Sequence, residues 1–117
     1  MKIRLLPILL LSTSTGCSAM NGENYKIQEV DVQDVRQEED STVIVYQTPM
    51  ESLYFSPGVR VERRGDDILL TAVRCHIKKN CDVDVEATVK DASSQVSVPS
   101  PKGSLYWFDG DQTKLVK

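Results

Sequence analysis

The amino-acid sequence predicts an all-β domain, built as a small antiparallel sandwich or a small barrel. Three observations support this prediction. From residue 42 onward, apolar and polar residues alternate with a period of two. Turn-forming residues interrupt this alternation at spacings of about 8–12 residues, which is typical of all-β folds. The same region lacks the period of about 3.6 residues that marks an amphipathic helix.

The predicted strands are short runs rich in β-branched and aromatic residues. In chain order they span 42–48, 53–55, 59–62, 68–77, 82–90, 95–98, 105–108 and 115–116. The run 82–90 alternates most regularly, which predicts a strand with one buried face. In the long run 68–77 we expect the core face to be formed by the odd-numbered Leu69, Val73, Cys75 and Ile77. The expected architecture is immunoglobulin-like, although the Cys–Trp–Cys spacing of antibody domains is absent.

Composition and charge predict how the chain is divided. Its 117 residues suit one domain, and a net charge of −3 provides no basic field for nucleic acid. The stretch 23–40 carries seven acidic residues against two basic ones. Such charge blocks are typical of solvated linkers. We therefore expect a flexible acidic tether over 17–41 and a β domain over 42–117.

The amino terminus has the three-part layout of a secretory signal peptide. Lys2 and Arg4 precede an apolar run over 5–11, and small polar residues follow over 12–16. Seven apolar residues in a helix rise only about 10 Å, whereas the hydrocarbon core of a bilayer is roughly 30 Å thick. Residues 1–16 are therefore expected to be a signal peptide rather than a permanent membrane span.

The segment Ser14-Thr15-Gly16-Cys17 resembles the bacterial lipobox, with Ser14 where that motif usually has Leu. The resemblance implies lipid transfer to the thiol of Cys17, cleavage between Gly16 and Cys17, and acylation of the new amino terminus. Ser18, rather than Asp, after the cysteine implies an outer-membrane address on the periplasmic side in a Gram-negative cell. The alternative is an ordinary signal peptide cleaved near residues 18–20, which would discard Cys17.

Cys75 and Cys81 form the second cysteine signal. Export places them in an oxidising compartment, and the five intervening residues include a credible turn at 78–80. We predict a structural disulfide between them. A metal site that also uses His76 and Asp82 is an alternative, but the spacing matches no common zinc pattern. A redox-active pair is a second alternative, although such pairs usually have two intervening residues.

Three further motifs have simple structural interpretations. Alternation in the run 105–108 predicts that Trp107 faces the core, while Tyr106 and Phe108 form a possible contact patch on the other face. The tripeptide at 64–66 reads Arg-Gly-Asp, and a hairpin turn explains it better than adhesion. The segment 109–111 reads Asp-Gly-Asp, and a turn explains it better than calcium binding.

No catalytic residues, metal ligands or cofactor are predicted from the sequence. One histidine and no nucleophile motif leave little basis for an enzyme. The expected function is a lipid-anchored, non-catalytic binding or accessory module, with the membrane and another envelope protein as partners. The alternatives are a structural or stress-related envelope lipoprotein without a dedicated ligand, or a small periplasmic enzyme.

Overall fold

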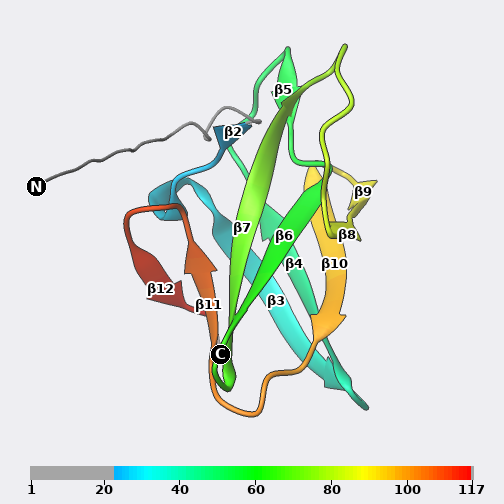
Figure 1. The fold of residues 1–117 in the computed structure, drawn as a ribbon. Coiled ribbons are helices and arrows are strands. Elements are labelled where there is room, and N and C mark those ends of the chain that lie inside the picture. Colours follow the sequence, from blue (N-terminus) through cyan, green and yellow to red (C-terminus); the bar gives the residue numbers. More distant parts are fainter. Residues whose placement is uncertain (1–22, 117) are drawn as a thin grey trace, which may run out of the picture.

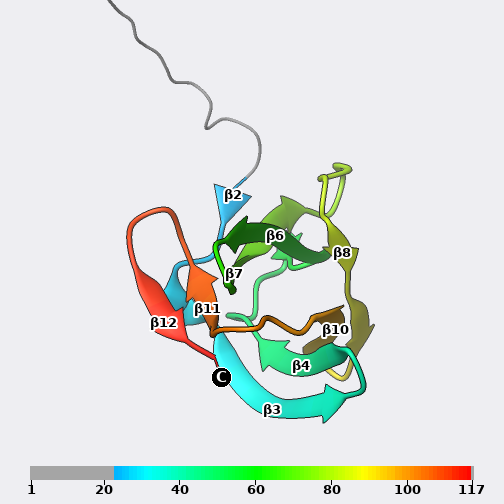
Figure 2. The ribbon, with the colours of Figure 1, turned by 60° about the horizontal axis from the view of Figure 1, so that its bottom comes forward.

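The computed structural model describes residues 23–116 and contains two β-sheets packed face to face (Figures 1 and 2). The predicted small all-β sandwich is thus confirmed, and over these residues the sheets do not close into a barrel. The predicted signal peptide 1–16, the cleavage site at Gly16 and Cys17, and the lipidation of Cys17 lie outside the described residues.

The first sheet has four strands in the order β3-β4-β10-β9, and every neighbouring pair is antiparallel. Its strands are β3 (Asp31–Glu38), β4 (Ser41–Gln47), β9 (Thr88–Lys90) and β10 (Ser93–Pro99). In β10 the alternation is complete, because Ser94, Val96 and Val98 are buried while the residues between them are exposed. The strand predicted over 95–98 is thus present, and its alternation matches the buried face.

The second sheet is organised around the long strand β7 (Asp67–His76). Its other strands are β2 (Glu23–Asn24), β5 (Tyr54–Phe55), β6 (Gly58–Arg64), β8 (Val85–Glu86), β11 (Leu105–Phe108) and β12 (Thr113–Leu115). The first part of β7 pairs with β6 and β11, and its last four residues pair with β2 and β5. Contrary to the antiparallel expectation, the β11–β7 pair is parallel.

The hydrophobic core lies between the sheets. Within it the rings of Trp107 and Tyr46 pack edge to face, with their centroids 5.2 Å apart. The core-facing residues of β7 are the even-numbered Ile68, Leu70 and Ala72. The predicted odd-numbered face is therefore wrong as the core face. Its members Leu69, Val73 and Cys75 are buried outside that core cluster, and Ile77 is 53% exposed beyond the strand end. The alternation did not identify the core face of β7, because this strand buries apolar residues on both faces.

The prediction of a tether up to residue 41 is wrong for the described part of that range. Tyr25, Ile27 and Val30 are buried in the core, and β3 pairs with β4 along its whole length. A short 3-10 helix, η3 (Ile27–Glu29), absorbs the change of phase between Ile27 and Val30, so that both side chains point inward. The β domain therefore includes residues 23–41. The acidic composition of β3 reflects its position at the sheet edge, where charged residues discourage unwanted strand pairing.

The regular run 82–90 is not one strand, contrary to prediction. It crosses between the sheets: β8 pairs with β6 in one sheet and β9 pairs with β10 in the other (Figure 2). The amide of Ala87, between the two strands, donates a hydrogen bond to the carbonyl of Pro57 at 2.8 Å. Gly58 permits the close approach, because a Cβ atom there would lie 2.1 Å from the carbonyl oxygen of Val85. The crossing leaves Val89 55% exposed.

Candidate functional site

The disulfide between Cys75 and Cys81 anchors the loop that follows β7. The two Cα atoms lie 6.0 Å apart, and Cys75 is buried at the strand end opposite Phe55. The structure confirms the predicted disulfide. Over residues 23–116, no group of three or more His, Cys, Asp or Glu side chains is placed to hold a metal ion.

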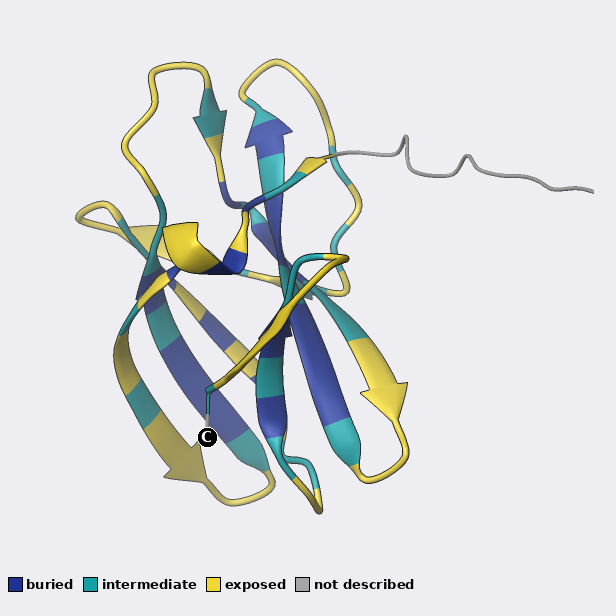
Figure 3. Cartoon of the chain, turned by 90° about the vertical axis from the view of Figure 1, so that its left-hand side faces the viewer, coloured by how far each residue is buried: buried dark blue, intermediate teal, exposed yellow. Residues whose placement is uncertain are grey.

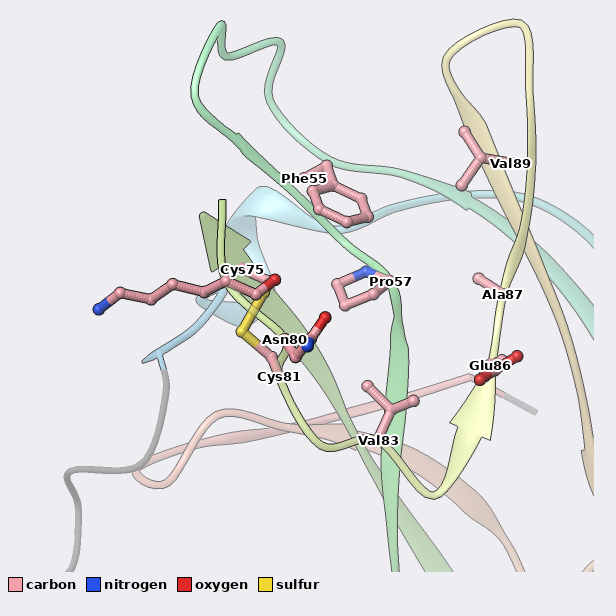
Figure 4. Close-up of a pocket in the computed structure, with 10 residues that line it drawn as sticks. Phe55, Pro57, Cys75, Asn80, Cys81, Val83, Glu86, Ala87 and Val89 are labelled. Atoms are coloured by element: carbon pink, nitrogen blue, oxygen red, sulfur yellow. A yellow bond between two sulfur atoms is a disulfide. The ribbon is translucent and has the colours of Figure 1, made fainter. Parts of the chain in front are cut away.

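An open groove of about 440 Å³ lies beside this disulfide (Figure 4). Its walls are the disulfide loop, the segment from β5 to β6, and the crossing segment that contains β8. The lining residues are Phe55, Pro57, Cys75, Lys79, Asn80, Cys81, Val83, Glu86, Ala87 and Val89. The apolar members Phe55 and Val89 remain 39% and 55% exposed. The groove can therefore accept an apolar side chain or segment, with Lys79 and Glu86 at its polar margin.

A second hollow of about 170 Å³ continues this surface. It shares Phe55 and Val89 with the groove and extends to the loop 48–51. We call the larger hollow, beside the disulfide, the groove surface. The groove surface could not be predicted from the sequence, because the alternation of 82–90 indicates a buried apolar face. The available signal was the position of Pro49 and Pro57 on either side of β5, because proline cannot donate to a sheet ladder and so limits the length of the strand between them.

The disulfide stabilises the groove wall, and its loss has a measurable expected effect. For so short a closed loop the chain-entropy model gives about 2 kcal/mol. We expect reduction, or the double substitution Cys75→Ser with Cys81→Ser, to lower the free energy of unfolding by about this amount while the far-ultraviolet circular dichroism spectrum remains that of a β protein. Urea titration with and without reductant measures this change. An effect of reductant on the double variant would contradict the assignment to this bond.

Arg74 organises the same end of the sandwich. Its guanidinium pairs with Glu51 at 2.6 and 3.2 Å, pairs with Glu23 at 3.1 Å, and lies 3.7 Å from the ring centroid of Tyr54. The hydrogen bonds from Arg74 hold the pKa of Glu51 below its usual range. These contacts join three segments that are distant in sequence: β2, the loop before β5, and β7.

Tyr25 completes this cluster from the core side. The ring is 2% exposed, and its hydroxyl donates a hydrogen bond to Glu51 at 3.1 Å. Burial raises the pKa of Tyr25 from 10.0 to about 12, and the neighbouring Glu51 carboxylate adds to this effect. The neutral phenol is thus favoured by the folded state.

Alkaline pH is expected to destabilise the protein through Tyr25. The unfolded chain ionises this phenol near pH 10 and the folded chain near pH 12, so the stabilisation is complete below pH 10 and is lost between these values. Two pKa units correspond to about 2.7 kcal/mol. Denaturant titrations at pH 9 and pH 12 should show this loss, and the loss should be smaller in Tyr25→Phe. An equal loss in Tyr25→Phe would contradict the assignment.

Tyr106 and Phe108 lie half-buried on the face of β11 opposite the buried Trp107. Tyr106 is in register with Leu69 of β7, and the Arg64 guanidinium lies 5.4 Å from the ring centroid of Phe108. The structure therefore separates this predicted contact patch from the groove surface. Its role in binding a partner stays a prediction.

The remaining motifs lie in turns. Gly65 adopts a φ of 64° in the β6–β7 turn. The carboxylate of Asp109 accepts hydrogen bonds from the amides of Asp111, Gln112 and Ile27. Burial alone would raise the pKa of Asp109, but these three donors lower it below its ordinary value. Asp109 thus ties the last turn to η3.

His76, the single histidine, is engaged in local contacts. Its ring packs edge to face on Tyr54 at 5.2 Å, and Nδ1 accepts a hydrogen bond from the amide of Lys78. Among the described residues, no helix has the length and hydrophobicity needed to cross a membrane.

Comparison with known proteins found no matching family model, no matching curated protein and no matching solved structure.

Proposed function

We propose that this chain is a lipid-anchored envelope protein, held on the periplasmic side of the outer membrane, and that its sandwich is a non-catalytic binding module for another envelope protein. The amino-terminal pattern supports the anchor, because Cys17 directly follows a short apolar run and small residues. The disulfide supports an oxidising compartment.

The observation that carries the binding role is the groove surface. Two of its apolar side chains, Phe55 and Val89, are exposed although they come from different sheets. Their backbones are held by strand pairing and by the disulfide at the opposite wall. A preformed groove whose walls are held by strand pairing and a disulfide binds a partner without a large ordering cost. The occupant we propose is an apolar segment of a second envelope protein.

Site-specific photo-crosslinking in intact cells tests this function. A photoreactive phenylalanine analogue in place of Val89 should give one discrete adduct, whose yield falls when Phe55→Ser is added. The matched control carries the analogue in place of Thr113, which is also exposed but lies on β12. Adducts of the same pattern from both positions, or none from Val89, would contradict binding through the groove.

A further inference from the structure

The end of the sandwich that carries β2 and β5 also carries three exposed apolar side chains. Met50 is 88% exposed, Leu53 is 51% exposed and Ile77 is 53% exposed. They belong to the loop before β5 and the loop after β7, which project from one end of the molecule (Figures 1 and 3). The amide of Ile77 donates a hydrogen bond to the carbonyl of Leu53 at 2.9 Å, so the two loops are joined at their bases.

The described chain begins at this same end. Glu23 pairs with Arg74 in the backbone register of β2 and β7, and the Arg74 side chain also binds Glu51, the residue after Met50. Glu23 lies six positions after Cys17, with only five residues between them. Even a fully extended chain of this length spans only about 20 Å. A lipid on Cys17 therefore holds this end of the sandwich close to the bilayer.

Two exposed lysines lie beside the exposed apolar side chains. These are Lys78 and Lys79, whereas Glu51 and Glu23 are paired with Arg74. The opposite end carries the acidic β3–β4 turn of Glu38, Glu39 and Asp40 (Figure 1). Anionic phospholipid headgroups attract basic residues and repel acidic ones.

We propose that Met50, Leu53 and Ile77 form a membrane-docking surface that dips into the phospholipid interface, with Lys78 and Lys79 at the level of the anionic headgroups. This inference rests on the proposed lipid anchor at Cys17 and adds an orientation to it. Apolar side chains at an interface enter the boundary between headgroups and acyl chains by about 5–10 Å. The lipid anchors the protein, and the docking surface fixes which end faces the bilayer.

Tryptophan quenching by brominated lipid tests this orientation. The full-length lipidated protein carrying Met50→Trp is reconstituted into phosphatidylethanolamine–phosphatidylglycerol vesicles with bromine on the acyl chains. The matched control is Lys102→Trp, an exposed position next to Gly103, whose amide donates a hydrogen bond to the carbonyl of Asp66 in the β6–β7 turn at the opposite end. The native Trp107 is 1% exposed and provides the same background in both proteins.

The inserted tryptophan at position 50 should lose most of its emission and shift to shorter wavelength, while the one at position 102 should keep its emission. Adding Leu53→Ser and Ile77→Ser to Met50→Trp should restore much of the lost emission. A lipidated protein in which position 50 is quenched no more than position 102 would overturn the orientation alone. A purified protein that carries no lipid by mass spectrometry would instead overturn the proposed anchor, so the two failures are distinguishable.

Discussion

A chain that begins at Asp40 is expected not to fold. Removing the residues before it deletes Tyr25, Ile27 and Val30 from the core and leaves β4 without its partner β3. Burial of each such side chain contributes about 1.5–3 kcal/mol. The three together are comparable with the whole net stability of a small domain, about 5–15 kcal/mol. Circular dichroism and thermal unfolding of chains starting at Ser18 and at Asp40 measure the effect.

Point substitutions keep this prediction specific to the core contacts. Tyr25→Ala should lower the melting temperature strongly, whereas Gln33→Ala should have little effect, because Gln33 is exposed on the edge strand β3. A cooperative transition at an unchanged temperature in the chain starting at Asp40 would show that the segment 23–39 is dispensable. It would also restore the interpretation of that segment as a tether.

The second large effect is expected from Cys17→Ser. Without the thiol no diacylglycerol can be attached, because the thiolate is the nucleophile for the lipid transfer. The protein should then disappear from the outer-membrane fraction, and the signal peptide proposed for residues 1–16 should stay uncut by the lipoprotein signal peptidase. One acyl chain binds a membrane only reversibly, whereas two or three anchor firmly. Fractionation and immunoblotting of cells expressing each form measure the loss, with Ser18→Ala as the matched control that keeps the thiol.

The sequence predicted the fold class because local alternation is set by burial on one face of a strand. This held for β10, whose alternate residues Val96 and Val98 line the core. It failed for β7, where both faces are covered, and for 82–90, where the chain passes from one sheet to the other after a few residues. In both places the tertiary arrangement decided the outcome, and a pattern of period two carries no information about which sheet a strand joins.

The candidate site could be predicted only in part. The disulfide could be predicted, because two cysteines near each other in an exported chain usually pair. The ion-pair cluster around Arg74 could not be predicted. Glu23, Glu51 and Arg74 are far apart in sequence and meet only when the chain folds and β2 pairs with β7. The acidic residues near the amino terminus were interpreted as solvent-exposed spacer, although Glu23 belongs to this ion-pair cluster.

The most direct test of a lipid-anchored sandwich is the intact mass of the protein purified from membranes without reductant. The proposed function predicts a mature chain that begins at Cys17, carries a diacylglyceryl group and an amino-terminal acyl chain, and has two hydrogens fewer than the reduced chain because of the Cys75–Cys81 bond. A mature chain that begins at residue 19, 20 or 21 and carries no lipid would contradict the anchor.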